Sequence, residues 1–470
     1  MSQAKVHSGS AGTHPSGGNA AVPGVGAAAR ACPALFIAGI ASGQGKTTVT
    51  AALARYHSAQ GLRVRVFKSG PDFLDPMILQ AASGHAVENL DLWMVGIARS
   101  RALLYAAACE SDLILIEGAM GLYDGKPSGA DLAEAFGVPV AAVIDAGAMA
   151  ETFGALALGL KSFRNTPFAG VIANRVASAG HRAMLAGSLP AGIPMLAAIG
   201  KAAVPLPERH LGLVQAAELP DLLQRLDALA QLVKEGGFTA LPPPLEFEAS
   251  ACEALPPTLS GLTIAVARDA AFSFIYPGNL ATLQELGAQL AFFSPLANNA
   301  VPAAAALWLP GGYPELHAER LSANLVWRDS VRAFHAAGKP MLAECGGMMS
   351  LFESLETVAG QGFAMAGLLP GRTIMQKKLA GLGMQSVQWP QGELRGHTFH
   401  YSRTETQLAA ERCAVKARDG AAGEAVYRRG ALTASYMHAY FPSCPAAAAA
   451  LFSAAASSEQ TTRTSAPARD

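Results

Sequence analysis

Residues 39–48 read Gly-Ile-Ala-Ser-Gly-Gln-Gly-Lys-Thr-Thr, where an apolar stretch, Leu35 to Ile40, runs into a segment of helical composition. The backbone N–H groups of such a loop bind phosphate oxygens, the lysine reaches the β and γ phosphates, and the first threonine hydroxyl can ligate Mg²⁺. The order of strand, glycine-rich loop, lysine and helix therefore predicts a phosphate-binding αβ domain. The predicted nucleotide contacts are Gly43, Gly45, Lys46, Thr47 and Thr48.

The composition describes a large, well-buried protein. The chain has 470 residues, of which 51% are hydrophobic and 15% charged, so two large domains are expected. Basic and acidic residues number 35 each, which gives no global field for nucleic acid or an anionic membrane surface. No apolar run reaches the length of a membrane span, and the six cysteines lack metal or disulfide spacing. We therefore expect a cytoplasmic protein without nucleic-acid or membrane partners.

Two series of strands and helices follow one another along the chain. Apolar strand candidates alternate with Ala/Leu-rich helical stretches, which predicts an α/β protein with two doubly wound domains. The expected strands are 35–40, 64–67, 113–116, 138–144 and 170–173, then 263–267, 289–293, 306–309 and 340–343. The predicted division is a disordered tail at 1–32, an ATP-binding domain at 33–238, a Pro-rich linker at 239–261, a second domain at 262–456 and a disordered tail at 457–470.

Carboxylates follow two strands of the first domain. Asp72 and Asp75 stand in a turn-rich segment after one strand, and Glu117 and Asp124 follow another. Because open sheets bind ligands at the carboxyl ends of their strands, we expect these four acids to be catalytic. Mg²⁺ takes oxygen ligands together with phosphate, which makes Thr47, Asp72 and Glu117 the predicted metal ligands. The predicted substrate-binding residues are Lys68, Leu74 and Arg175, with Arg209 and His210 as further cationic candidates.

A single thiol stands at the apex of a sharp turn in the second domain. Cys345 lies in Pro-Met-Leu-Ala-Glu-Cys-Gly-Gly-Met-Met (340–349), where a strand runs into glycines and a helix. Glycines allow close backbone approach, and a helix N-terminus lowers the pKa of a thiol. We therefore expect Cys345 to be a nucleophilic thiolate.

A nucleophilic cysteine needs a base and oxyanion donors. His438, in Tyr-Met-His-Ala-Tyr, is the preferred base, while His397 and His400 form a second candidate cluster. The turn Leu309 to Tyr313 offers exposed backbone N–H groups. The predicted oxyanion donors are Gly311, Gly312 and Gly346.

The two halves resemble two known families. The Gly-x5-Gly-Lys-Thr spacing resembles the dethiobiotin synthetase-like branch of P-loop proteins, and the second domain resembles class I glutamine amidotransferases of the cobyric/cobyrinic type, with a flavodoxin-like fold. Those amidotransferases commonly carry His-Pro-Glu, whereas this chain has His438-Ala439-Tyr440. The third member of the triad is therefore missing at that position, so either another acid supplies it or the pair works as a dyad.

The span from about residue 34 to 456 resembles the cobyrinic acid a,c-diamide synthases. Matching stretches include Lys68 to Pro76, Glu117 to Gly125, Asn174-Arg-Val176, Leu309 to Glu315 and Glu344 to Gly347. The resemblance implies a corrinoid substrate, ATP and L-glutamine as co-substrates and Mg²⁺ as cofactor. ATP would phosphorylate the a and c carboxylates, and ammonia from glutamine would convert them to amides. It also implies an adenine contact by Asn174 and an ammonia channel between the domains, and it leaves a homodimer open.

Alternative substrates and functions stay open at this point. Hydrogenobyrinic acid and nickel-sirohydrochlorin could undergo the same reaction. They stay open as substrates because the sequence does not indicate the ring or its metal. Cobyric acid synthases have a segment similar to Lys-Pro-Gln-Asn-Met at the position where this chain has Lys68-Ser-Gly-Pro-Asp72. Partition-type switch ATPases carry an extra lysine early in the phosphate loop, which this chain lacks. Both are more distant alternatives.

Overall fold

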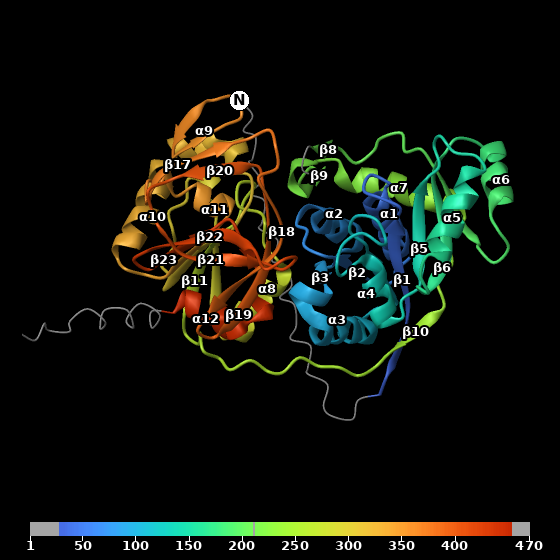
Figure 1. The fold of residues 1–470 in the computed structure, drawn as a ribbon, viewed down its shortest axis with the longest axis horizontal. Helices are drawn as coiled ribbons and strands as arrows, with labels where there is room; N and C mark the ends of the chain where they lie inside the picture. Colours follow the sequence, from blue (N-terminus) through green and yellow to red (C-terminus); the bar gives the residue numbers. More distant parts are fainter. Residues whose placement is uncertain (1–27, 210–211, 454–470) are drawn as a thin grey trace, which may run out of the picture.

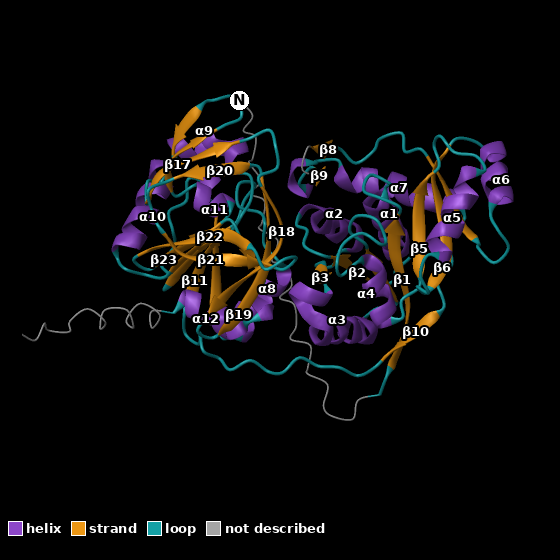
Figure 2. Ribbon diagram, viewed as in Figure 1, coloured by secondary structure: helices purple, strands orange, loops and turns teal. Residues whose placement is uncertain are grey.

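The computed structural model describes residues 28–209 and 212–453, which form two αβ units joined by a long connection (Figure 1). Helices cover both faces of the first unit's sheet, whereas the second unit carries most of its strands in its C-terminal part (Figure 2). Both units are αβ folds, as predicted. His210 lies outside the described residues, as do the predicted tails except for 28–32.

The first unit is built on a parallel sheet with the strand order β3-β2-β4-β1-β5-β6-β7. The strands are β1 Arg30–Gly39, β2 Val64–Ser69, β3 Glu88–Leu90, β4 Leu113–Glu117, β5 Val140–Asp145, β6 Phe168–Val176 and β7 Met195–Gly200, with a short pair β8 Glu208–Arg209 and β9 Gly212–Leu213. The helices are α1 Lys46–Ala59, α2 Leu74–Ser83, η1 Leu92–Gly96, α3 Ile97–Glu110, α4 Gly129–Phe136, α5 Thr152–Ser162, α6 Ala179–Ser188, η2 Ala216–Glu218 and α7 Leu222–Gly236. The five strands expected here are confirmed.

Both faces of this sheet are buried, which explains its uninterrupted apolar strands. Along β1, Phe36 packs into the core on one face with residues of α3, α4, α5 and α6. Its neighbours Leu35 and Ile37 pack into the core on the other face with residues of α1, α2 and α7. The two cores hold the strand ends in place, so the loops after β1, β2 and β4 meet at one edge.

The N-terminal boundary and the linker differ from the prediction. β1 begins at Arg30, and β10 (Pro244–Phe247), inside the expected linker, pairs antiparallel with its first residues. Cys32 and Phe247 are buried by this pairing. Residues 30–32 are therefore strand rather than tail. Pro244 can begin β10 because proline is tolerated as the first residue of an edge strand.

The second unit is built on a ten-stranded mixed sheet with the order β12-β11-β13-β14-β23-β22-β21-β18-β19-β24. Strands β12 to β23 in this order are parallel, and the remainder pair antiparallel. The strands are β11 Thr263–Ala267, β12 Gln289–Phe293, β13 Ala306–Leu309, β14 Met341–Glu344, β18 Gly381–Trp389, β19 Gly392–His400, β21 Ala410–Lys416, β22 Ala422–Arg429, β23 Leu432–Ser435 and β24 His438–Ala439. The four expected strands are confirmed, and the antiparallel extension was not foreseen.

Helices and a small second sheet complete this unit. A four-stranded sheet has the order β16-β15-β17-β20. Its strands are β15 Phe352–Glu356, β16 Gly362–Ala364, β17 Leu369–Met375 and β20 Ser402–Glu405. The helices are α8 Pro277–Glu285, η3 Pro295–Ala297, η4 Pro314–His317, α9 Ala318–Ala323, α10 Leu325–Ala336, α11 Gly346–Met349, η5 Phe441–Ser443 and α12 Pro445–Phe452.

An apolar cluster joins the two units. It contains Phe73, Met94 and Val95 of the first unit together with Tyr276 and Tyr440 of the second. Arg395 of β19 reinforces the contact, because its guanidinium donates to the backbone O of Trp93 at 2.9 Å. The units therefore share a packed interface, and it lies beside the segment that carries Asp72 and Asp75.

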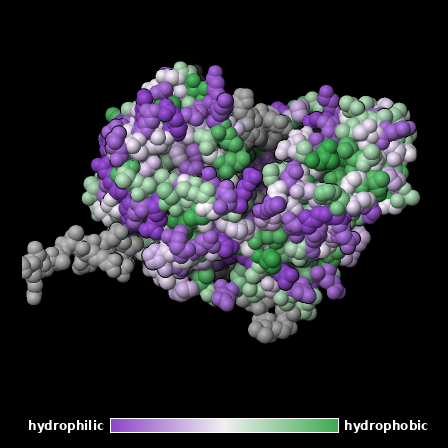
Figure 3. Space-filling view, viewed as in Figure 1, coloured by the Kyte–Doolittle hydropathy of each residue, from purple (hydrophilic) through white to green (hydrophobic). Residues whose placement is uncertain are grey.

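The outer surface mixes polar and apolar residues. Exposed apolar side chains such as Phe163, Leu325 and Leu382 belong to separate elements, and Figure 3 shows hydrophobic residues in separate patches among hydrophilic ones. Within 28–209 and 212–453, every helix is too short or too polar to cross a membrane.

Candidate active sites

The phosphate loop joins β1 to α1 as the sequence predicts. Gly43 and Gly45 adopt φ values of 77° and 90°, a region that favours glycine. Lys46 is buried, and its Nζ donates to the backbone O of Ala41 at 2.9 Å and of Met120 at 2.6 Å. Burial and the nearby Lys68 lower the pKa of Lys46. The lysine thus bridges the two loops at the edge of the sheet where a phosphate chain would lie.

Asn174 supports this loop from β6, which lies two strands away from β1 in the sheet. Its Nδ2 donates to the backbone O of Gln44 at 3.0 Å, and a Cβ added to Gly45 would lie 2.3 Å from the same nitrogen. The residue therefore contacts the loop backbone directly. Its contact with adenine stays a prediction.

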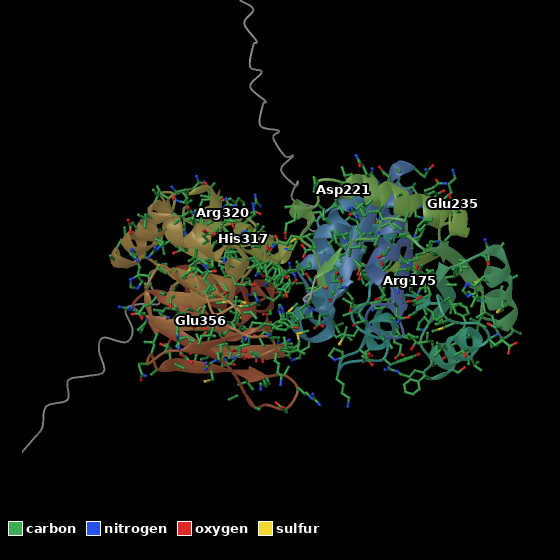
Figure 4. All side chains as sticks on the ribbon, turned by 90° about the horizontal axis from the view of Figure 1, so that it is seen from above. Arg175, Asp221, Glu235, His317, Arg320 and Glu356 are labelled. Carbon is green, nitrogen blue, oxygen red and sulfur yellow. The ribbon has the colours of Figure 1, made fainter. Side chains whose placement is uncertain are left out.

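Arg175 is turned away from the other predicted substrate-binding residues. Its side chain is 48% exposed and forms an ion pair with Asp145. Figure 4 shows Arg175 on the first unit, away from the contact with the second. The structure therefore does not bring Arg175 to the acid cluster.

Lys68 lies at the centre of the acid cluster. Its Nζ is 2.6 Å from Asp75 Oδ2, 2.8 Å from Glu117 Oε1 and 3.4 Å from Asp72 Oδ2. Thr47 of the phosphate loop donates to Glu117 Oε1 at 2.6 Å. Five residues predicted from separate motifs therefore meet at the carboxyl ends of β2 and β4.

In this cluster, three carboxyl groups surround the ammonium group of one lysine. Although burial opposes it, the carboxylates of Asp75 and Glu117 raise the pKa of Lys68 well above its usual value, so the lysine is charged. Burial raises the pKa of Glu117, and burial together with Asp75 raises the pKa of Asp72 to about 7. Burial also acts on Asp75, but Lys68 outweighs it and lowers the pKa of this carboxyl. The cluster is thus ready to accept a further cation.

Two predicted residues have a structural part in this region. Asp72 Oδ1 accepts hydrogen bonds from the backbone N of Leu74 at 2.9 Å and of Asp75 at 3.2 Å, which caps α2. Leu74 is buried in the first turn of that helix. Asp124 lies outside the Lys68 network, because its side chain is exposed and its Oδ2 accepts from Gly121 N at 3.0 Å.

Two of the predicted metal ligands, Thr47 and Glu117, lie side by side. Glu117 Oε2 is buried and has no hydrogen-bond partner among the described residues, and the Thr47 hydroxyl lies beside the other oxygen of the same carboxyl. In the described part of the chain, no group of three or more His, Cys, Asp or Glu side chains is arranged to hold a metal by itself. The donor set therefore fits Mg²⁺ with phosphate oxygens completing its coordination.

The second site is built around a strained cysteine. Cys345 follows β14 with φ 44° and ψ −108°, a backbone conformation that is rare for residues other than glycine. Its backbone N donates to Ser435 O at 2.7 Å, which fixes the turn. The side chain is buried, and its thiol is hydrogen-bonded by the backbone of Gly346. This is the apex that the sequence predicted.

The protonation state of Cys345 differs from the prediction. Burial, aided by the negative charge of Glu315, raises the pKa of the Cys345 thiol. Helix α11 has only four residues, so its N-terminus offsets little of the burial. Burial also lowers the pKa of His438 well below its usual value. Both shifts favour a neutral thiol and a neutral imidazole, in contrast to the thiolate expected from the sequence.

Glycines allow the parts of this site to approach each other. A Cβ added to Gly311 would lie 2.2 Å from His438 Cε1, and one added to Gly346 would lie 2.9 Å from the backbone N of Gly312. The three glycines predicted as oxyanion donors therefore gather around the thiol and the histidine. Their role as donors stays a prediction.

Among the described residues, none donates to or accepts from His438 Nδ1, which is buried without a partner. The nearest acid in sequence to the thiol, Glu344, accepts from Ala439 N and from Trp308 Nε1, both at 2.8 Å. It is therefore bound elsewhere. The choice between a replacement acid and a dyad stays a prediction.

The two alternative histidines lie in the same region. His397 stacks on His438, with the ring centroids 5.1 Å apart. Its Nδ1 forms a hydrogen bond with the Tyr276 hydroxyl at 3.0 Å. Burial lowers the pKa of His397 to about 3. His400 is held by Glu424 at 3.0 Å.

Sequence reasoning missed the residue that connects the two sites. Phe73, between Leu74 and Asp72, packs its ring 5.1 Å from the ring of His438, centroid to centroid. Its only signal in the sequence is an aromatic side chain between two acids that are predicted to be catalytic.

Comparison with known proteins agrees with this two-site arrangement. The model of the CobQ/CobB/MinD/ParA nucleotide binding domain matches residues 35–211. The model of the CobB/CobQ-like glutamine amidotransferase domain matches residues 263–445.

Curated relatives match over almost their whole length. The hydrogenobyrinate a,c-diamide synthase of Stutzerimonas stutzeri is 58% identical over 427 residues, which cover 90% of this chain and 99% of that protein. The chain belongs to the a,c-diamide synthase family. The hydrogenobyrinate a,c-diamide synthase of Pseudomonas aeruginosa is 56% identical over 90% of this chain and 98% of its own. The cobyrinate a,c-diamide synthase of Herminiimonas arsenicoxydans is 55% identical, covering 89% of this chain and 96% of its own.

Membership of the a,c-diamide synthase family assigns a class of chemistry to the two sites. The amidotransferase domain follows the nucleotide-binding domain in the sequence, and the chain is a glutamine-dependent, amide-forming ligase.

Replacing Gly311 by alanine should disable the glutamine site selectively. The added methyl would displace the His438 ring, so glutamine hydrolysis should fall by roughly 10²-fold, the usual cost of a small misplacement of a catalytic group. Release of glutamate measures this. Ammonia-supported amidation should persist, and Gly362→Ala, where nothing lies within 4 Å of the added Cβ, is the matched control. Unchanged glutamine hydrolysis in Gly311→Ala would contradict the placement of His438.

Proposed function

We propose that this enzyme amidates the a and c side-chain carboxylates of cobyrinic acid or of its metal-free counterpart, hydrogenobyrinic acid. The observation that carries the proposal is the acid cluster around Lys68, which lies beside the phosphate loop and is linked through Phe73 to the Cys345 and His438 site. The relatives that share this sequence over nearly their whole length carry the names of these two activities.

The first half-reaction would take place at the phosphate loop. A side-chain carboxylate oxygen attacks the γ-phosphorus of ATP, ADP leaves, and an acyl phosphate forms. Lys46, already turned toward the Met120 carbonyl at the edge of the sheet, would bind the transferred group. Phosphate is a far better leaving group than hydroxide, so ammonia can then attack the carbonyl carbon and expel it. Asp72 and Asp75 would orient the substrate carboxyl.

The metal site supports this half-reaction. Mg²⁺, when bound with the nucleotide, would neutralise the charge that develops on the phosphate oxygens. Glu117 and Thr47 would hold it, since Glu117 Oε2 has no hydrogen-bond partner in the described part of the chain. Asp72 is the third candidate, and its Oδ2 is the oxygen not used in capping α2.

The second half-reaction would supply the nitrogen. The Cys345 sulfur attacks the side-chain amide carbon of glutamine, and its proton passes to His438 and on to the departing ammonia. Water then hydrolyses the thioester to glutamate. Backbone N–H groups of Gly312 and Gly346 would bind the oxyanion. Because ammonia in bulk water is mostly protonated and not nucleophilic, release beside the interface favours its direct use.

We also place this reaction in the cytoplasm. The six cysteines are all free in the structure, and four of them are exposed or half-buried: Cys109, Cys252, Cys413 and Cys444. Free, accessible thiols suit a reducing compartment.

The identity of the ring is tested by offering it directly. Purified protein receives MgATP and glutamine with cobyrinic acid, hydrogenobyrinic acid or nickel-sirohydrochlorin, and mass spectrometry counts the new amides. We expect two amides on cobyrinic or hydrogenobyrinic acid. Two amides on nickel-sirohydrochlorin alone, or more than two on any ring, would contradict the proposed substrate.

Substitutions at the two sites should separate the half-reactions. Cys345→Ala should lower glutamine-dependent amidation by about 10⁴-fold or more, as loss of a covalent nucleophile does, and leave ammonia-dependent amidation largely intact. Lys46→Ala should lower amidation from both nitrogen sources by roughly 10²–10³-fold, because it removes charge stabilisation during phosphoryl transfer. Product amides are measured with glutamine and with ammonium chloride. Loss of both activities in folded Cys345→Ala, or retained turnover in Lys46→Ala, would refute these assignments.

A further inference from the structure

The orientation of His438 poses a physical problem. A histidine that takes a proton from a nucleophile must present one ring nitrogen to it, and commonly a hydrogen bond to the other nitrogen fixes the ring. Here Nδ1 is buried and has no partner among residues 28–209 and 212–453, and Glu344 is bound to Trp308 and Ala439 instead. Something other than a carboxylate must hold the ring.

Aromatic rings supply that restraint in the structure. His397 stacks nearly parallel to His438, with centroids 5.1 Å apart and an interplanar angle of 20°. Phe73 packs at the same centroid distance of 5.1 Å but tilted by 53°, and Phe274 lies 6.0 Å away. Gly311 leaves space for the ring edge, as the short distance from its built Cβ to Cε1 shows. His438 is therefore enclosed by packing rather than held by a hydrogen bond.

Phe73 differs from the other rings because it comes from the first unit. It stacks on Phe274 at 4.9 Å with an interplanar angle of 1° and packs on Tyr276 at 4.4 Å. Its backbone is fixed by its neighbours, since Asp72 caps the helix that follows and Asp75 is bound to Lys68. The ring is thus held rigidly at the surface of one site while it contacts the base of the other.

We propose that Phe73 is a positioning residue for the glutamine site: its ring orients His438 in place of the missing acid. This inference rests on the proposed function of Cys345 and His438 in glutamine hydrolysis. It implies that the glutamine site is incomplete without the loop that binds the acyl substrate. A change in that loop, through Asp72 or Asp75, would act on His438 by the same contact.

The test compares three variants of the full chain. Phe73→Ala removes the ring, Phe73→Tyr keeps it, and Met94→Ala removes another buried apolar side chain from the same interface cluster. Glutamate release gives kcat and KM for glutamine hydrolysis without ATP or corrinoid, and amidation with ammonium chloride reports the other site. We expect kcat in Phe73→Ala to fall by about 10-fold or more with KM for glutamine little changed, since a misplaced base slows chemistry rather than binding. Phe73→Tyr and Met94→Ala should remain close to wild type.

Several results would overturn the proposal. An equal loss of kcat in Met94→Ala would mean that any cavity at the interface has this effect. A rise in KM with unchanged kcat would place Phe73 in glutamine binding, and failure of Phe73→Tyr to restore kcat would exclude orientation by the ring. Loss of ammonia-dependent amidation equal to that of glutamine hydrolysis in Phe73→Ala would place its role in the first site. Because glutamine hydrolysis needs no corrinoid, a wrong ring assignment would leave this test intact.

Discussion

The buried ammonium group of Lys68 is the interaction on which the arrangement depends. It is 3% exposed and lies within 2.8 Å of carboxylate oxygens from Asp75 and Glu117. A buried charge is tolerated only when it is paired, so the lysine fixes the ends of β2 and β4 relative to each other. Through Asp75 it also fixes the start of α2, and with it the direction of Phe73. One buried charge thus sets the geometry of the first site and of the contact with the second.

This dependence makes the interface part of the chemistry. The aromatic contact from Phe73 to His438 joins the segment that carries Asp72 and Asp75, the proposed catalytic acids, to the proposed base of glutamine hydrolysis. Met94, Val95, Tyr276 and Tyr440 pack around Phe73 at this interface, so the contact between Phe73 and His438 belongs to a buried apolar cluster. Ammonia released at Cys345, as we propose, would form on the side of the interface that Phe73 contacts. The ligase is better described as one active region with two chemistries than as two independent domains.

Local patterns predicted much of this structure. The phosphate loop, the cysteine turn and nine strands were readable because each depends on residues close together in the sequence. The clustering of Lys68, Asp75 and Glu117 followed from the rule that parallel strands end at one edge. The antiparallel extension, β10, the raised pKa of Cys345 and the Phe73 contact were not readable. Each depends on a partner distant in the sequence: a pairing strand, a burying neighbour or the opposite unit.

The most direct measurement follows nitrogen across the interface. The enzyme receives MgATP, its corrinoid substrate and glutamine labelled with ¹⁵N in the side-chain amide, together with an excess of unlabelled ammonium chloride, and mass spectrometry reads the isotope in the product amides. If the two sites form one region, the amides carry ¹⁵N well beyond its share of the free ammonium. Amides whose label matches the bulk pool would contradict this account, because the nitrogen would then have left the protein before use.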